Sequence, residues 1–143
     1  MIERKEIANE KTILIGTIKP GETDELIKEH LNELELLAET AGAKVIGKIS
    51  QRISKINSAT FIGNGKANQI INQAIELNAK LIIFDDELSP AQIKNYHNLS
   101  DKIKVLDRSG LILDIFRKHA RTKEATTQVD LAYLEYLLPR LTR

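Results

Sequence analysis

The sequence predicts an α/β protein with an open parallel sheet of about four strands, helices on both faces, and a long C-terminal helix. Short apolar segments alternate along the chain with stretches whose apolar residues recur at helical spacing. This alternation is typical of parallel strands joined by right-handed helical crossovers. The first apolar segment contains few polar residues, as expected for a strand buried on both faces, whereas the second, at 43–49, alternates. At 143 residues, the chain is long enough for one core of ordinary size.

The first strand is expected at residues 12–18, where TILIGTI is almost wholly apolar. A Pro-Gly pair at 20–21 ends this strand. Thr23 then stands where a helix needs an N-cap, with acidic residues in the following turn that the helix dipole favours. Apolar residues at helical spacing carry this helix to about Thr40, and the glycine two residues later is a natural stop.

The remaining elements follow the same rhythm. In chain order we expect a strand at 43–49, an apolar piece at 60–62, a helix at 67–77, a strand at 81–84, a helix at 89–98, a strand at 103–106 and a helix at 111–120. Residues 81–84 are the most hydrophobic, which favours a central position in the sheet. Residues 50–59 are polar and irregular, which predicts a mobile loop.

The last helix, expected at 123–138, carries two apolar stripes. One consists of Ala125, Val129, Ala132 and Tyr136, and the other of Leu131, Leu134 and Leu138, with Leu141 continuing it beyond Pro139. Such a helix must be covered on two faces or it exposes an apolar patch. One face can lie on the α/β body, so the other is expected to contact a partner outside this chain. We therefore divide the chain into an α/β domain at 1–121 and a helical segment at 122–143.

The composition excludes several kinds of chemistry. The chain has no cysteine, which excludes disulfides, thiolate catalysis and cysteine-based zinc sites. The histidines, His30, His97 and His119, lack the spacing of metal ligands, so no metal site is expected. The N-terminus is charged and no apolar run could cross a membrane, so we expect a cytoplasmic protein without membrane insertion. A net charge of +1 does not predict general attraction to nucleic acid.

Three acidic residues, Asp85, Asp86 and Glu87, follow the expected strand at 81–84. They should lie at the carboxyl edge of the sheet, where open α/β sheets bind ligands. The next residues form a capping box, with Ser89 as the cap and Gln92 three residues on. We favour a solvated turn that begins a helix. Binding Mg²⁺ or acting as a general base would require further partners near these carboxylates.

A glycine-rich segment and an arginine could complete a nucleotide or anion site with Asp85 and Asp86. Gly63, Gly65 and Lys66 open a helix and could hold a phosphate, but their spacing fits neither a Walker A motif nor GxGxxG. A tight turn that requires positive φ explains the glycines equally well. Arg108 follows the strand at 103–106, and we favour an ion pair with the carboxylates over a bound anion.

The densest basic run consists of Arg117, Lys118, His119, Arg121 and Lys123. It could contact phosphates, and a solvated junction between helices is an equally good interpretation. No series of aromatic residues accompanies it, which argues against stacking of single-stranded bases. The residues alone thus indicate no assembled catalytic set, and we do not expect this chain by itself to be an enzyme.

Five motifs together resemble, in order and spacing, the N-terminal domain of the HflX family of ribosome-associated GTPases. They are TFIGNGK (60–66), LIIFDDELSPAQ (81–92), KVLDRSGLILDIF (104–116), HARTKEATTQVDLAYL (119–134) and YLLPRLTR (136–143). The resemblance implies an α/β domain, a pair of long antiparallel helices, and a G domain that binds GTP and Mg²⁺. The helix at 123–138 would be the first arm of that pair, and the second arm and the G domain would lie beyond Arg143. One departure is Ala-Thr-Thr at 125–127, where the family usually carries Gly-Lys-Leu.

The resemblance also implies a function. The family binds the large ribosomal subunit and splits ribosomes, and its N-terminal domain helps to dock on ribosomal RNA and restrains GTP hydrolysis. No cofactor is expected in this chain, although ATP binding and RNA remodelling are attributed to this part of family members. The residues expected to approach RNA are Arg117, Lys118, Arg121, Lys123, Arg140 and Arg143. Two alternatives are an ATP-binding domain with weak hydrolase activity and a scaffold that forms a homodimer through Leu131, Leu134 and Leu138.

Overall fold

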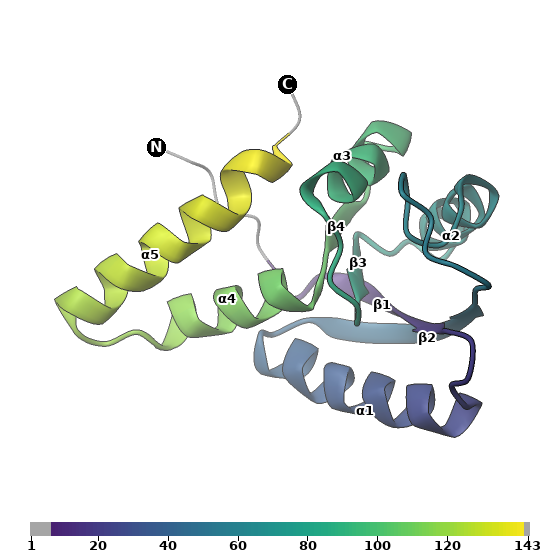
Figure 1. The fold of residues 1–143 in the computed structure, drawn as a ribbon. Helices are drawn as coiled ribbons and strands as arrows, with labels where there is room; N and C mark the ends of the chain where they lie inside the picture. Colours follow the sequence, from purple (N-terminus) through teal and green to yellow (C-terminus); the bar gives the residue numbers. More distant parts are fainter. Residues whose placement is uncertain (1–6, 142–143) are drawn as a thin grey trace.

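The computed structural model describes residues 7–141. These residues contain a four-stranded sheet in the order β2-β1-β3-β4, and every neighbouring pair is parallel. The strands are β1 (Lys11–Ile18), β2 (Lys44–Arg52), β3 (Leu81–Phe84) and β4 (Lys104–Leu106). The predicted parallel α/β class is therefore confirmed, and Figure 1 shows the sheet with its covering helices.

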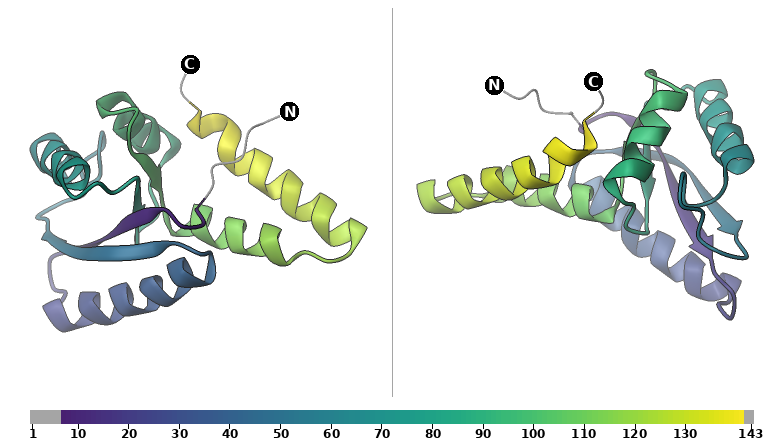
Figure 2. Two further views of the ribbon diagram at one scale, coloured as in Figure 1. Left: turned by 180° about the vertical axis from the view of Figure 1, so that it is seen from behind. Right: turned by 45° about the horizontal axis from the view of Figure 1, so that its top comes forward.

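Helices cover both faces of the sheet. They are α1 (Asp24–Thr40), α2 (Asn64–Glu76), α3 (Pro90–Leu99), α4 (Arg108–His119) and α5 (Lys123–Leu137), followed by a short 3-10 turn at Leu138–Arg140. Helix α1 and the first turns of α4 pack on one face, and α2 and α3 pack on the other. Helix α5 runs back beside α4, and the two project together from the body (Figure 2).

The central strands supply both halves of the core by simple alternation. In β1, Ile13 and Ile15 join the cluster under α2 and α3, whereas Leu14 points to the cluster under α1 and α4. Gly16 allows α1 to lie close over β1, because a Cβ at that position would come within 2.8 Å of Cγ2 of Ile27. A strand that is buried on both faces consists almost wholly of apolar residues, so β1 could be predicted from the sequence.

Local capping signals also gave correct helix starts. The Thr23 side chain accepts a hydrogen bond from the amide of Leu26 at 3.1 Å. At the start of α3, Ser89 and Gln92 form both bonds of the predicted capping box. Each of these contacts spans three residues, so the sequence pattern is sufficient to predict it.

The expected mobile loop at 50–59 is partly wrong, because β2 continues through Arg52. The rest of the segment is anchored by α3. Gln92, Asn95 and Tyr96 donate side-chain hydrogen bonds of 2.8 Å to three backbone carbonyls within residues 57–60. The donors lie on one face of α3, so a polar loop is fixed by side chains about 36 residues away in the sequence.

Candidate functional site

The carboxyl ends of β1 and β3 lie side by side at the centre of the sheet. The chain leaves β1 for α1 on one face and leaves β3 for α3 on the other. This divergence makes a topological switch point, outside which open α/β sheets bind their ligands. The residues that follow β1 and β3 therefore form the candidate site.

Asp86 is paired with two side chains at the end of β1. Lys19 Nζ lies 2.6 Å from Asp86 Oδ1, and the Thr17 hydroxyl donates to Oδ2 at 2.7 Å. Lys19 also lies over the ring of Phe61, 5.8 Å from its centroid. We missed Thr17 and Lys19 in the sequence, although both stand at the end of an apolar run at the same predicted edge.

Asp85 is paired with side chains from two helices on one face. Arg108 Nη1 of α4 lies 2.6 Å from Asp85 Oδ1, so the ion pair favoured from the sequence is present. His30 Nδ1 of α1 lies 3.8 Å from Oδ2. Burial raises the pKa of the Asp85 carboxyl above its ordinary value, Asp86 adds to this effect, and Arg108 and His30 oppose it. Desolvation thus outweighs pairing at this carboxylate.

We expect Asp85→Asn to be at least as stable as the unmodified chain at neutral pH. A carboxyl whose folded-state pKa is raised binds its proton more tightly in the folded chain. The Asp85 carboxyl therefore contributes fully to stability at a pH below its ordinary pKa of 3.8. This contribution is lost as the pH rises through the raised pKa of the folded chain. Urea unfolding in acid and at neutral pH, with the exposed Asp24→Asn as control, measures the difference. A variant that loses stability only at neutral pH would contradict this expectation.

The start of α4 contacts the loop after β3 through three consecutive residues. Asp107 Oδ2 accepts from the amide of Leu88 at 3.0 Å, Arg108 pairs with Asp85, and the Ser109 hydroxyl donates to Glu87. We predicted this helix at 111–120, and that start is wrong by three residues. The error arose because Asp107 caps the helix, its Oδ1 accepting from the amide three residues later at 3.0 Å.

The glycine-rich segment opens α2 on the other face of the sheet from Arg108. Gly63 is the N-cap with φ of 105°, a conformation that favours glycine. Lys66 Nζ donates to the carbonyl of Arg52 at 2.9 Å. At Gly65 a Cβ would meet no atom within 4 Å, so nothing in the described chain requires glycine there. The six residues of the predicted nucleotide site thus share an edge, divided between opposite faces of the sheet.

Two of the predicted RNA-contacting arginines stack on tyrosines. The guanidinium of Arg117 lies 3.9 Å from the ring centroid of Tyr133 and 3.5 Å from Asp130 by its Nε. Arg140 lies 3.8 Å from the ring centroid of Tyr136. Arg117 thus joins α4 to α5, and Arg140 is held against the end of α5, which reduces what both can offer to a phosphate.

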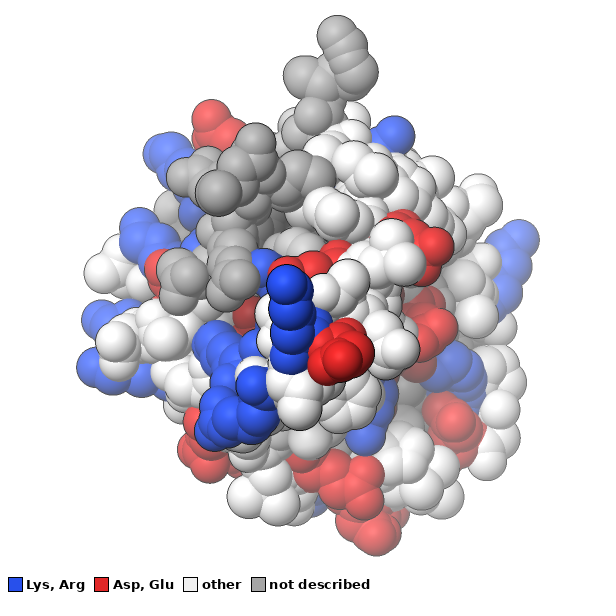
Figure 3. All heavy atoms as spheres, turned by 90° about the vertical axis from the view of Figure 1, so that its left-hand side faces the viewer, with Lys and Arg blue, Asp and Glu red and all other residues white. Residues whose placement is uncertain are grey.

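The other predicted basic residues lie nearer the α4–α5 turn. Lys118 Nζ donates to the carbonyl of Ala41 at 2.7 Å, whereas Arg121 and Lys123 are exposed. Figure 3, which faces this end of the molecule, shows basic side chains gathered together with acidic ones beside them. Arg143 lies outside the described residues. Of the residues expected to approach RNA, Arg121 and Lys123 are thus accessible at this turn.

The fully buried side chains of helix α5 belong to neither expected stripe, and the first stripe, which contains Tyr136, is partly buried beside them. Tyr133 and Leu137 are its buried side chains, and they face α4 and the body. Leu131 and Leu138 are each 57% exposed, and Leu134 is partly buried. The expected pairing with a helix beyond residue 143 remains a prediction, and the exposed leucines are available for it.

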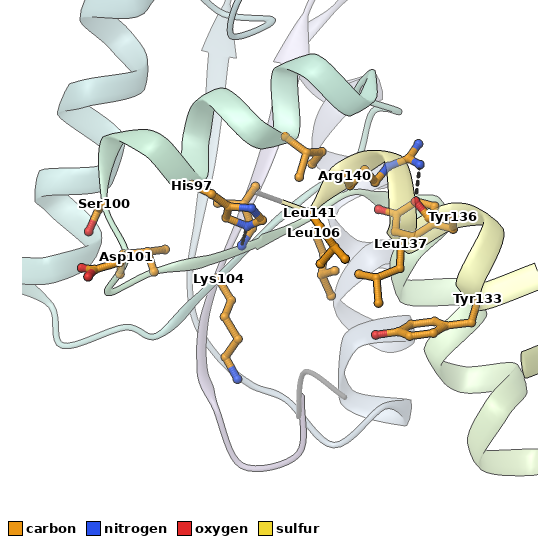
Figure 4. Close-up of a pocket in the computed structure, with 13 residues that line it drawn as sticks. His97, Ser100, Asp101, Lys104, Leu106, Tyr133, Tyr136, Leu137, Arg140 and Leu141 are labelled. Carbon is orange, nitrogen blue, oxygen red and sulfur yellow. Dashed lines mark hydrogen bonds between the residues drawn. The ribbon is translucent and has the colours of Figure 1, made fainter. Parts of the chain in front are cut away.

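A cavity of about 320 Å³ lies between α3, β4 and α5. Figure 4 shows its lining, in which Leu106 and Leu137 are apolar and Lys104 and Arg140 are charged. His97 Nε2 accepts from the amide of Val105 at 3.4 Å, on the outer side of the edge strand. Sequence reasoning missed this cavity, because three elements that are distant along the chain form it.

The described residues offer neither a metal site nor a membrane span. Within residues 7–141, no three or more His, Asp or Glu side chains are grouped so that they could hold a metal ion. Over the same range, no helix combines the length and the apolar character that a membrane span requires. The candidate site is therefore an edge of paired charges without a ready ligand set for a metal.

Comparison with known proteins gives the class of this domain. Residues 28–117 match the family described as GTP-binding GTPase N-terminal. In structure, the chain resembles SsGBP in complex with GDP, with a TM-score of 0.70 and 30% identity over 92% of this chain and 36% of that one. It also resembles a GTP-binding protein of Sulfolobus solfataricus in complex with GDP, with a TM-score of 0.68 and 32% identity. That similarity covers 91% of this chain and 38% of the archaeal one. The fold is thus the N-terminal α/β domain of GTP-binding proteins.

Curated relatives identify the family more closely. The chain is 46% identical to GTPase HflX of Flavobacterium psychrophilum over 142 residues, which is 99% of this chain and 34% of the relative. It is 38% identical to GTPase HflX of Escherichia coli over 95% of this chain and 31% of that protein. The chain belongs to the HflX family and corresponds to its N-terminal domain. It spans about one third of the length of these relatives.

Proposed function

We propose that this chain is the RNA-contacting and regulatory N-terminal domain of a cytoplasmic HflX-type protein that binds the large ribosomal subunit. The whole protein would bind and hydrolyse GTP in a separate G domain and would split ribosomes. Family membership is the observation that carries this proposal. The chain's contribution would be binding rather than chemistry, because the charges at its sheet edge are neutralised by one another.

The α4–α5 turn supplies the proposed contact with RNA. Arg121 and Lys123 are exposed there, and Lys118 lies near the end of α4, three residues before Arg121. Phosphate contacts by such cations give affinity that is independent of sequence and falls steeply with salt. Helices α4 and α5 support the turn from two sides, so its cations are presented at the end of a projecting arm (Figure 2).

The interpretation as a nucleotide-binding domain is less favoured by the geometry. Asp86 is bonded to Lys19 and Thr17, and Asp85 to Arg108. Coordination of Mg²⁺ would require these carboxylates to exchange their present partners for the ion. Binding of a nucleotide at this edge would therefore begin by breaking ion pairs that are already formed.

Sedimentation of the chain with purified large ribosomal subunits at several salt concentrations tests the proposal. We expect Arg121→Ala with Lys123→Ala to weaken binding and to reduce the slope of log affinity against log salt by about two, since each lost phosphate contact reduces it by about one. The control is Lys28→Ala with Lys80→Ala, which also removes two exposed charges. Equal binding by both double variants, or no binding by the unmodified chain, would contradict the proposal.

A further inference from the structure

Asp107 joins three separate parts of the molecule through one buried carboxylate. The side chain, 1% exposed, accepts from the amide of Leu88 in the β3–α3 loop and from the amide of Gly110 in α4. It also accepts a hydrogen bond from the hydroxyl of Tyr136 in α5. We call Asp107, Leu88, Gly110 and Tyr136 the Asp107 junction.

Glycine at position 110 makes this junction possible. A Cβ there would lie 2.6 Å from Oη of Tyr136 and 3.0 Å from its Cζ. Tyr136 can therefore reach Asp107 only over a residue without a side chain. Gly110 has an ordinary helical φ, so backbone conformation does not require glycine here. The close approach of Tyr136 does.

Burial makes the three hydrogen bonds depend on one another. A buried carboxylate needs hydrogen-bond donors in place of water, and a lost donor cannot be replaced while the site stays dry. Two of the donors, the Gly110 amide and the Tyr136 hydroxyl, share the same oxygen, Oδ1. Withdrawal of Tyr136 would therefore leave the negative charge poorly solvated, and Asp107 would have to reorient toward other donors.

The loop held by Asp107 carries the candidate site. Leu88 directly follows Asp85, Asp86 and Glu87, whose contacts define the carboxyl edge of the sheet. At the other end of the junction, Tyr136 lines the cavity beside β4 together with its neighbour Leu137 (Figure 4). The Asp107 side chain thus links the position of α5 to the geometry of the acidic loop.

We propose that the Asp107 junction couples the docking of α5 to the geometry of the acidic loop at residues 85–88. Displacement of α5 withdraws the Tyr136 hydroxyl and loosens the loop, and a ligand that moves the loop weakens the attachment of α5. The coupling does not depend on which ligand the edge takes. It provides a physical route by which the sheet edge and the helix that follows α4 influence one another.

Hydrogen exchange of the chain, followed amide by amide, tests this coupling. We expect Tyr136→Phe to accelerate exchange at the amides of Leu88 and Gly110 by about tenfold, the effect of losing one hydrogen bond to a charged group. Gly110→Ala should accelerate Leu88 similarly, because it displaces the same hydroxyl. Combining the two substitutions should add little at Leu88, since both remove one contact.

Tyr133→Phe is the matched control, because it removes a hydroxyl from the same helix outside the junction. It should leave the exchange of the Leu88 amide unchanged. Unaltered exchange at Leu88 in Tyr136→Phe would overturn the proposal, because the Tyr136 hydroxyl would then have no influence on the bond between Asp107 and Leu88. An equal acceleration throughout β1 would also overturn it, because that pattern reports a general loss of stability.

Discussion

Asp107→Ala should lower the free energy of unfolding by about 3 kcal/mol, as expected when a helix cap and buried hydrogen-bond acceptors are lost together. The carboxylate is 1% exposed and accepts from Leu88, Gly110 and Tyr136. Alanine leaves all three donors without this acceptor in a site that water hardly reaches. Urea unfolding followed by circular dichroism measures the change.

Thr122→Ala is the matched control for this substitution. Thr122 caps α5 by accepting from the amide of Ala125 at 3.0 Å, but it is exposed, and within residues 7–141 its hydroxyl accepts from that donor alone. We expect it to cost about 1 kcal/mol or less, the usual cost of losing an exposed cap. Similar small losses in the two variants would show that Asp107 acts as a cap alone.

Tyr96→Ala should destabilise the chain by about 4 kcal/mol, the range found for removing a buried aromatic ring. Tyr96 is wholly buried, and its ring centroid lies 5.2 Å from that of Phe84 at the end of β3. Its hydroxyl donates to the carbonyl of Thr60 at 2.8 Å. Burial raises the pKa of this hydroxyl, so it remains a donor throughout the neutral range. Thermal and urea unfolding measure the loss.

Tyr96→Phe separates the hydroxyl from the ring. It should cost about 1–2 kcal/mol, because the buried carbonyl of Thr60 loses its donor. Tyr133→Phe again serves as control, since the Tyr133 ring packs on Arg117 and would be retained. If Tyr96→Phe is as stable as Tyr133→Phe, the hydrogen bond from Tyr96 to the carbonyl of Thr60 contributes nothing to stability.

The elements of the fold could be predicted from the sequence wherever the signal is local. The strand at 81–84 is apolar throughout because it is central, and it lies at the predicted residues. Thr23 and Ser89 cap helices that begin next to them. The start of α4 was placed three residues late, because Asp107 was interpreted as part of a loop. Its cap bond to the amide of Gly110 is local, whereas its bonds to Leu88 and Tyr136 depend on the tertiary structure.

The candidate site could be predicted only in part. The sequence placed Asp85, Asp86 and Arg108 at one edge, and the structure pairs Arg108 with Asp85. It gave no indication that Lys19 would neutralise Asp86, because these residues are 67 positions apart and meet only through the pairing of β1 with β3. The stacking of Arg117 on Tyr133 was equally hidden, because it depends on how α5 rotates against α4.

The sequence by itself determined the order of strands and helices, the parallel class of the sheet and most helix starts. These features arise from burial periodicity and from hydrogen bonds between residues a few positions apart, which any short window of sequence contains. The tertiary structure alone decided the strand order, the partner of each buried charge and the stripe of α5 that is covered. These features depend on which side chains, distant in the sequence, are packed together away from water. A buried charge needs a partner, and the packing decides which residue is close enough to provide it.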